Sequence, residues 1–202
     1  MPDHRLRSGP SLAGRRIGLL GGSFNPAHDG HRFISLYAIK QLRLDQVWWL
    51  VSPQNPLKSA KGMASLKSRC AMAATIARHP KIVVTALEAE LRTRYTADTL
   101  RVLRQRFPRT RFVWLMGADN LQQITAWNRW TEIFRLMPIA VLRRPTYAAG
   151  RKASKAAQRF EAAWLPARRA GSLASLRPPA WMVLQNRYNK LSATEIRRRL
   201  QR

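Results

Sequence analysis

The sequence is poor in cysteine, and it contains no long apolar run. Its single cysteine, Cys70, excludes an internal disulfide, and the apolar helical pattern around it predicts a buried structural thiol rather than a reactive one. No apolar run approaches the roughly 20 residues that span a bilayer. The first fifteen residues are basic and lack the apolar core of a signal peptide. These absences predict a cytoplasmic protein in which residues 1–14 form a disordered basic tail.

Acidic residues are scarce as well. Ten Asp and Glu stand against 37 Lys and Arg, which gives a net charge of +27. The acids form no cluster with metal-ligand spacing, since the closest pair is Glu88 and Glu90, and this predicts no metal site built by the protein. The positive charge implies an anionic partner, but the basic residues are not interleaved with aromatic residues and no nucleic-acid-binding motif is present. Two explanations of the charge stay open: the codon bias of a GC-rich genome, and a basic nucleic-acid-binding protein.

Strands that alternate with helices predict a single α/β domain over residues 15–202. The sheet is expected to be doubly wound, parallel and Rossmann-like, with a strand order of about 3-2-1-4-5. The expected strands are 16–20, 46–51, 81–86, 111–116, 138–143 and 181–184. The main expected helices are 31–42, 65–79 and 152–164, with a loose loop after the last of them. In that order strands one and four are neighbours, and ligands bind beyond their carboxyl ends.

The stretch from Gly21 to His31 has the features of a phosphate-binding loop. It lies between an apolar strand and an amphipathic helix, and its two glycines allow a sharp turn and a close approach to a ligand. His28 and His31 lie three residues apart at the predicted start of the helix, where free N–H groups and the helix dipole favour an anion. Neither GxGxxG nor GxxxxGK[ST] occurs in the chain, so any nucleotide is held by a different device.

A second helix start near the end of the chain has similar features. Ser192 with Glu195 three residues later forms a capping box, and the hydroxyl of Thr194 and the guanidinium of Arg197 lie in the same turn. This segment predicts a second phosphate cradle. Asp119 follows the predicted fourth strand, so we expect it to face the histidine loop, although capping of the next helix is an alternative role.

Other candidate residues have equally plain structural alternatives. Thr96 is a plausible N-cap of the helix after residue 95. Trp127 offers an indole face suited to a flat, electron-poor pyridinium, with core packing as the alternative. Trp130 is expected to pack in the core with Ile133 and Phe134. Lys58, in a loop broken by prolines, is either a phosphate ligand or an ordinary loop lysine.

The stretch Gly22-x-Phe24-x-Pro26-x-His28-x-Gly30-His31 resembles the GxFxPxHxGH signature of the nucleotidyltransferase superfamily that shares the HxGH motif with class I aminoacyl-tRNA synthetases. Further segments resemble the bacterial nicotinate-nucleotide adenylyltransferases within it. These segments are 52–58, 93–100, 117–119 with Trp127, 143–145 and 191–197. Together the similarity spans the chain from Ile17 to about Leu200, with Arg94 standing where the family usually has Ser.

The resemblance implies transfer of an adenylyl group from ATP to nicotinate mononucleotide in NAD biosynthesis, with deamido-NAD and pyrophosphate as products. It implies that the catalytic residues are His28, His31 and Arg197. It implies that ATP is bound by Gly21, Gly22, Ser23, Phe24, His28, His31, Lys58, Asp119, Ser192, Thr194 and Arg197. It implies that the mononucleotide is bound by Asn25, Tyr95, Thr96, Asp119, Trp127 and Asn128. Other members of the superfamily, such as phosphopantetheine and FMN adenylyltransferases, remain alternatives, as does activity on the amidated mononucleotide.

The sequence contains no Ser-His-Asp or Cys-His constellation, which argues against a covalent adenylyl-enzyme. We expect direct in-line attack of the mononucleotide phosphate on the α-phosphorus of ATP, with Mg²⁺ carried in on the ATP phosphates. We expect no membrane partner and no specific nucleic acid, and the oligomeric state cannot be read from the sequence.

Overall fold

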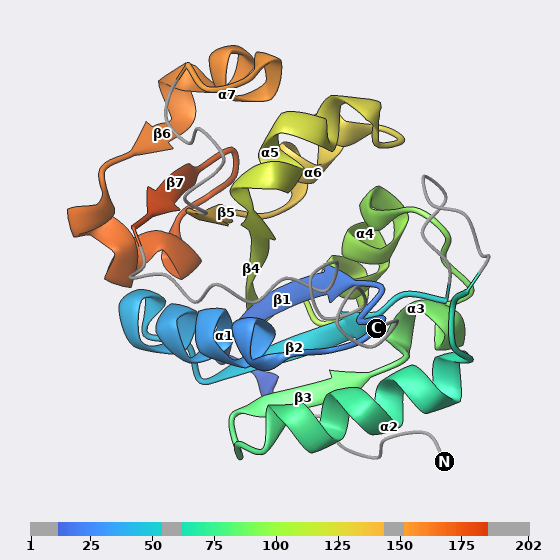
Figure 1. Cartoon of the computed structure of the whole chain (residues 1–202). Helices are drawn as coiled ribbons and strands as arrows, with labels where there is room; N and C mark the ends of the chain where they lie inside the picture. The colour runs from blue at the N-terminus through green and yellow to red at the C-terminus, as the bar shows by residue number, and fades with distance from the viewer. Residues whose placement is uncertain (1–11, 54–61, 144–151, 186–202) are drawn as a thin grey trace.

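A computed structural model describes residues 12–53, 62–143 and 152–185 of the chain. Through these residues runs one seven-stranded sheet with helices on both faces (Figure 1). The strand order is β3-β2-β1-β4-β5-β7-β6, and every neighbouring pair is parallel. Four of the predicted site residues lie outside the described residues: Lys58, Ser192, Thr194 and Arg197. Residues 1–11 of the predicted tail lie outside them as well.

The elements follow one another in this order along the chain. The strands are β1 (Arg16–Gly22), β2 (Gln46–Val51), β3 (Ile82–Thr85), β4 (Arg111–Gly117), β5 (Ile139–Leu142), β6 (Trp164–Leu165) and β7 (Trp181–Leu184). The α-helices are α1 (Asp29–Leu42), α2 (Leu66–Ala77), α3 (Leu87–Glu90), α4 (Thr96–Arg106), α5 (Ala118–Gln123), α6 (Trp130–Leu136) and α7 (Lys155–Arg159). The 3₁₀ helices are η3 (Ile124–Ala126), η4 (Glu161–Ala163) and η5 (Ala167–Ser175).

The predicted doubly wound sheet is confirmed, and β7 and β6 extend it at one edge. β1 lies between β2 and β4, so the loops that follow β1 and β4 leave neighbouring strands at the same edge. At this edge, Leu20 pairs with Leu115 shortly before both strands end. The chain therefore brings the histidine loop and Asp119 to the carboxyl ends of adjacent strands, as the strand order predicted.

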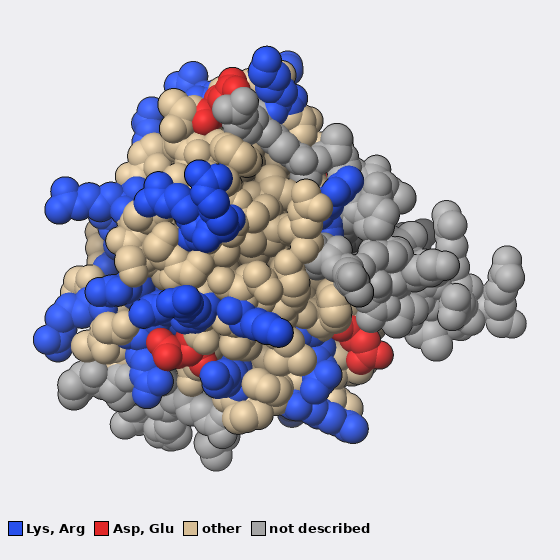
Figure 2. All heavy atoms as spheres, turned by 90° about the vertical axis from the view of Figure 1, so that its left-hand side faces the viewer, with Lys and Arg blue, Asp and Glu red and all other residues tan. Residues whose placement is uncertain are grey.

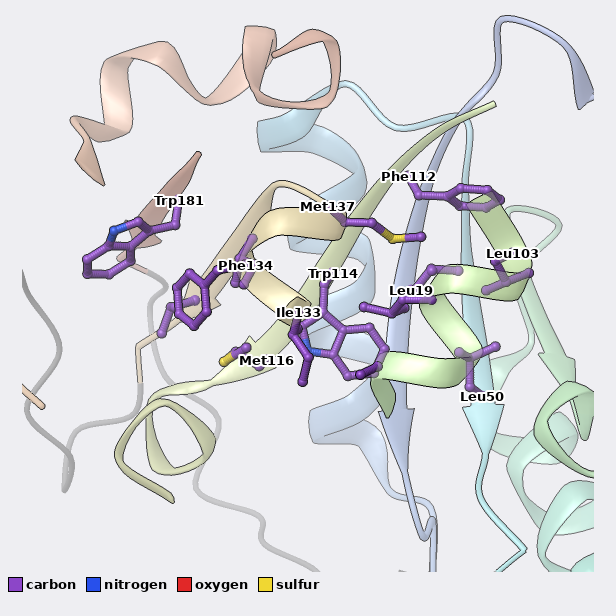
Figure 3. Close-up of a cluster of buried hydrophobic side chains, with 14 of the residues drawn as sticks. Leu19, Leu50, Leu103, Phe112, Trp114, Met116, Ile133, Phe134, Met137 and Trp181 are labelled. Carbon is purple, nitrogen blue, oxygen red and sulfur yellow. The ribbon is translucent and has the colours of Figure 1, made fainter. Parts of the chain in front are cut away.

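Alternating side chains divide the core into two layers, one on each face of the sheet. In β4, Trp114 and Met116 face α4, α5 and α6, whereas Leu115 faces α1, α2 and η5. Figure 3 shows the first layer, where Trp114 lies close to Ile133 and Phe134 near Trp181. Such continuous burial on both faces is what parallel strands require.

The part of the chain after β5 differs from the expectation. The predicted helix 152–164 is only α7 followed by η4, and the predicted loose loop contains β6 and the nine-residue η5. In η5, Ala170, Leu173 and Ala174 are buried in the same layer as α1. The Ala- and Arg-rich composition predicts a loop. The segment forms a 3₁₀ helix instead, because the spacing of these three apolar residues allows them to pack together against the sheet.

The predicted tail, residues 1–14, includes three residues that are packed against the domain. Leu12 is buried in the core, its carbonyl accepts a hydrogen bond from the Thr110 hydroxyl, and the Gly14 amide donates to the Arg109 carbonyl. Residues 12–14 are thus anchored beside β4 rather than part of a tail. Cys70 is partly exposed rather than fully buried, and burial raises its pKa, which is consistent with an unreactive thiol. Within the described residues, no helix has the length and apolar character needed to cross a membrane.

Candidate active site

His28 and His31 lie together at the start of α1. His28 is the N-cap residue, and its Nδ1 accepts a hydrogen bond from the Gly30 amide at 3.1 Å. In return, Nδ1 of His31 accepts from the His28 amide at 3.2 Å, so the pair forms a reciprocal capping box. The two ring centroids are 3.9 Å apart. Two imidazoles are therefore fixed against the main chain at the positive end of a helix dipole.

This arrangement selects one tautomer for each neutral imidazole. Because Nδ1 of both rings accepts a hydrogen bond from the main chain, the proton of the neutral ring is carried on Nε2. Each ring can then donate from Nε2 to an oxygen. An anion bound at this helix start would receive hydrogen bonds from neutral histidines without any change of protonation.

Buried aromatic side chains pack against the His31 ring. The ring of Phe24 lies 4.7 Å from the His31 ring and stacks on Trp49 at 5.1 Å. The Trp49 indole donates to the Ser35 hydroxyl at 2.8 Å, and that hydroxyl donates to the His31 carbonyl at 2.8 Å. Phe24 is 2% exposed, and its ring packs in the core against Trp49.

The glycines before the loop have a different role from the one expected. Gly21 and Gly22 belong to β1, and the left-handed conformation in this loop is adopted by Phe24, with a φ of 47°. A Cβ on Gly21 would lie 2.5 Å from Cη2 of the buried Trp114. Gly21 is therefore required for close packing of β1 against that indole.

Asp119 is the second residue of α5, directly after the carboxyl end of β4. Gly117 is the N-cap residue of this helix and makes no side-chain cap bond, so Asp119 is not the N-cap. Asp119 thus lies in the first turn, where the helix dipole favours a carboxylate. Its strand is the neighbour of the strand that leads to the histidines.

The predicted N-cap Thr96 is also wrong. α4 begins at Thr96, its N-cap is Tyr95, and the Tyr95 carbonyl accepts from the amides of Asp98 and Thr99. The Thr99 hydroxyl lies 2.8 Å from that of Thr93 and 3.3 Å from the Tyr95 carbonyl. Threonines flanking Tyr95, rather than Thr96 itself, hold the turn in place.

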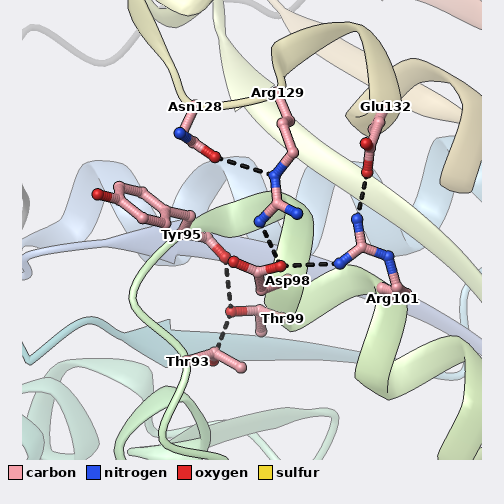
Figure 4. A network of polar contacts seen from close by, with 8 residues as sticks. All are labelled: Thr93, Tyr95, Asp98, Thr99, Arg101, Asn128, Arg129 and Glu132. Atoms are coloured by element: carbon pink, nitrogen blue, oxygen red, sulfur yellow. Dashed lines mark hydrogen bonds and ion pairs between the residues drawn. The ribbon is translucent and has the colours of Figure 1, made fainter.

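An ion-pair network joins α4 to the loop after η3 (Figure 4). Asp98 accepts hydrogen bonds from Arg101 and from Arg129, and Arg101 also pairs with Glu132 of α6. Arg129 in turn donates from Nε to the Asn128 side chain at 3.0 Å. The network, defined here as Asp98, Arg101, Arg129 and Glu132, therefore ties the turn at Tyr95 to the segment that carries Trp127 and Asn128.

Trp127 ends η3 in an extended conformation and is half-buried against the core. Its amide donates to the Ile124 carbonyl at 2.9 Å, which fixes the main chain of this segment. The neighbouring Asn128 is exposed. Trp130 packs edge-on against Phe134, as predicted, with ring centroids 6.3 Å apart.

Comparison with known proteins identifies the family. A family model described as cytidylyltransferase-like matches residues 19–199. A protein of Parvibaculum lavamentivorans named "Probable nicotinate-nucleotide adenylyltransferase" is 51% identical over 186 residues, covering 92% of each chain. A protein of Erythrobacter litoralis with the same name is 55% identical, covering 91% of this chain and 84% of its own.

The chain belongs to the nicotinate-nucleotide adenylyltransferase family.

A solved structure has the same fold. The Plasmodium falciparum nicotinic acid mononucleotide adenylyltransferase complexed with NaAD matches with a TM-score of 0.69 over 91% of this chain and 83% of its own, at 16% identity. This likeness shows the fold alone: the sheet and its helices have the architecture of this adenylyltransferase fold.

In this member of the adenylyltransferase family the predicted site residues separate into two groups. The first group lies at the ends of β1 and β4, in the loop after β1 or in the first turns of the helices that follow: Gly21, Gly22, Ser23, Phe24, Asn25, His28, His31 and Asp119. The second group lies where the network joins α4 to the loop after η3: Tyr95, Thr96, Trp127 and Asn128. The Asn25 side chain does not stand alone, since it bonds the Gly62 carbonyl and the Ala64 amide.

Positive charge covers one face of this member of the adenylyltransferase family. Figure 2 shows Lys and Arg side chains across the face that contains α1 and η5, with few acidic ones between them. A field of this sign raises the local concentration of polyphosphates around the chain.

Two features of the site are missed by sequence reasoning. Arg69 lies on α2 within an apolar pattern, yet it is 1% exposed and bonds four carbonyl groups. The ion-pair network joins residues about 30 positions apart, which no local pattern reveals. The only local signal was the i,i+3 spacing of Asp98 and Arg101.

The buried carboxyl group of Glu88 on α3 should make the free energy of unfolding depend on pH. Burial raises its pKa from 4.5 to about 7, so between these values the folded chain binds more protons than the unfolded one. The free energy of unfolding should therefore fall by about 3 kcal/mol as the pH rises through this window, and then level off. Urea denaturation at pH 5 and pH 8 measures the difference. Glu88→Gln should remove this slope and the exposed neighbour Glu90→Gln should keep it; an unchanged slope in Glu88→Gln contradicts the assignment.

Proposed function

We propose that this chain transfers the adenylyl group of ATP to nicotinate mononucleotide, forming deamido-NAD and pyrophosphate in NAD biosynthesis. The single observation that carries the proposal is that Nδ1 of both imidazoles accepts a main-chain hydrogen bond at the start of α1, which makes Nε2 of each neutral ring the donor. The chain is also about half identical to relatives named for this reaction. Two neutral donors beside a helix N-terminus suit the charge that develops on a transferring phosphoryl group.

The mononucleotide phosphate is the nucleophile. Because it is already an anion near neutral pH, it needs no general base, and it attacks the α-phosphorus in line while pyrophosphate leaves. His28 and His31 donate hydrogen bonds to the transferring group as charge builds on it. Arg197, with Ser192, Thr194 and Lys58, is proposed to hold the departing pyrophosphate. In this proposal the chain supplies positioning and charge stabilisation rather than covalent catalysis.

Mg²⁺ is proposed to enter on the ATP phosphates. Among the residues that the structure describes, no group of three or more His, Cys, Asp or Glu could hold a metal ion. Divalent Mg²⁺ commonly binds through substrate phosphates, where it neutralises charge. The chain then binds the polyphosphate, and its own donors at α1 act on the phosphate oxygens.

The mononucleotide is proposed to lie between α4 and the loop after η3. The indole of Trp127 would stack on the pyridine ring, while main-chain amides near Tyr95, Thr96 and Asn128 would receive the nicotinate carboxylate. Asp119 would contact the nucleotide between the two ends of the site. A carboxylate held by amides distinguishes the acid from the amide form by charge.

Pyrophosphate release tests the proposal directly. The purified chain is incubated with ATP and Mg²⁺ and with one acceptor at a time: nicotinate mononucleotide, nicotinamide mononucleotide, FMN or 4′-phosphopantetheine. We expect the highest kcat/KM with nicotinate mononucleotide. A higher value with FMN or 4′-phosphopantetheine would overturn the proposed substrate, and a higher value with the nicotinamide form would reverse the preference for the acid.

Asp98→Asn tests whether the network positions the turn at Tyr95 against the segment that carries Trp127 and Asn128. Loss of the ion pairs from Asp98 to Arg101 and Arg129 should raise the KM for the mononucleotide about fivefold while the KM for ATP stays the same, because a partly exposed ion pair is worth up to about 1 kcal/mol. Initial-rate kinetics measures both constants. Asp45→Asn removes an acid that bonds Arg15 and the Arg16 amide at the start of β1, and it should leave both constants unchanged. Equal constants in Asp98→Asn and Asp45→Asn would show that the network does not shape the site.

A further inference from the structure

Arg69 is a buried arginine that bonds main-chain carbonyls of three separate segments. Nε donates to Ala64 at 2.9 Å, just before α2. Nη1 donates to Ser23 at 2.7 Å and to Ser52 at 2.8 Å, and Nη2 donates to Pro53 at 2.9 Å. The residue is 1% exposed. One guanidinium thus joins the histidine loop, the chain that follows β2 and the start of α2.

The chemistry of this contact needs an arginine. A guanidinium carries five N–H donors in a rigid planar fork, whereas a lysine carries three on a single flexible atom. Four carbonyl oxygens in different directions match the fork and cannot all be reached from one ammonium. Burial lowers the pKa of Arg69 from its ordinary value, which indicates that the charge is kept here at a desolvation cost.

The bond to Ser23 orients the peptide that enters the phosphate loop. In a trans peptide the C=O and the following N–H point in opposite directions. Because Arg69 holds the Ser23 carbonyl, the Phe24 N–H is directed away from the guanidinium. Phe24 has a φ of 47°, a conformation that a non-glycine residue keeps only when its surroundings impose it.

Three further hydrogen bonds hold the same junction. The Ser52 amide donates to the Gly22 carbonyl at 2.9 Å, and the Asn25 side chain bonds both Gly62 and Ala64. The peptide between Ser23 and Phe24 therefore lies between anchored neighbours, and Arg69 is the group that fixes its rotation.

We propose that Arg69 is a positioning residue for adenylyl transfer: it fixes the Ser23–Phe24 peptide so that the Phe24 N–H joins Nε2 of His28 and His31 in facing the phosphates. This inference rests on the proposed function. Arg69 acts through the main chain and does not itself touch the substrate. Its loss frees the peptide to rotate, so the donors no longer converge on the transferring group.

The test uses Arg69→Lys and Arg69→Ala, with Lys67→Ala as the matched control. Lys67 is an exposed cation on the same helix, so its removal tests the loss of charge alone. Initial rates give kcat and KM separately, and thermal melting confirms that each variant is folded. We expect kcat to fall about 10²-fold in both Arg69 variants, because small misplacements of reacting groups have effects of this size. The KM for the mononucleotide should stay within about threefold, and Lys67→Ala should match the wild type.

Chemical rescue and an amide signal complete the test. Ethylguanidinium should restore kcat of Arg69→Ala at least about tenfold, while ethylammonium should not, since it lacks the planar fork. Titration with pyrophosphate should shift the Phe24 amide resonance in the wild type, and the shift should be lost in Arg69→Lys. A folded Arg69→Lys variant with kcat within twofold of the wild type, or with an unchanged Phe24 shift, overturns the proposal. A wild type that turns over no mononucleotide overturns the proposed function instead, and the Phe24 signal still tests the role of Arg69.

Discussion

Replacing His28 or His31 with alanine should lower kcat by about 10²–10³-fold while the chain stays folded. Each substitution removes one Nε2 donor that meets charge on the transferring group, and loss of one such donor has an effect of this size in acyl transfer. The KM for the mononucleotide should change little, because the lost interaction strengthens in the transition state. Pyrophosphate release under saturating substrates measures kcat.

The capping role of His28 requires a separate control. His28→Ala also removes the acceptor of the Gly30 amide, which should cost about 1 kcal/mol of stability. His28→Asn can keep the cap but has no Nε2, so it should melt near the wild type and still lose kcat. His79→Ala, in the turn after α2, should behave as the wild type. A His28→Asn variant with kcat within twofold of the wild type would contradict a catalytic role.

Trp127→Ala should raise the KM for nicotinate mononucleotide about 10–100-fold and leave the KM for ATP unchanged. The reason is the loss of a stacking face, since removing an aromatic platform under a base costs about 1–3 kcal/mol. The two KM values are measured by varying one substrate at saturation of the other.

The half-burial of Trp127 makes a control necessary. Trp127→Phe keeps an aromatic face and should recover most of the affinity for the mononucleotide. Trp130→Phe changes the neighbouring tryptophan, which packs against Phe134, and should leave the substrate constants near those of the wild type. If Trp127→Ala lowers the melting temperature but leaves both KM values unchanged, Trp127 is a core residue and the stacking role is wrong.

The sequence predicts the sheet and the histidine loop well for physical reasons. Parallel strands buried on both faces appear as short apolar runs, and the run before Gly21 leads directly to a turn and an amphipathic helix. The strand order then places Asp119 beside the histidine loop without any knowledge of side chains. These features depend on local patterns and on the rules of parallel sheets.

The supporting contacts could not be predicted in the same way. Arg69 bonds carbonyl groups, and every residue has one, so no partner residue type marks the contact. The pattern predicts a sharp turn at the glycines, but the left-handed residue is Phe24, whose ring packs against His31 and Trp49. Tertiary packing decides both features.

A structure of the chain bound to deamido-NAD tests the central claim most directly. The account predicts that Nε2 of His28 and of His31 lie within hydrogen-bond distance of the oxygens on the two phosphates, with the pyridine ring stacked on Trp127. A dinucleotide whose phosphates contact neither imidazole, or rings that present Nδ1 to the ligand, would contradict it.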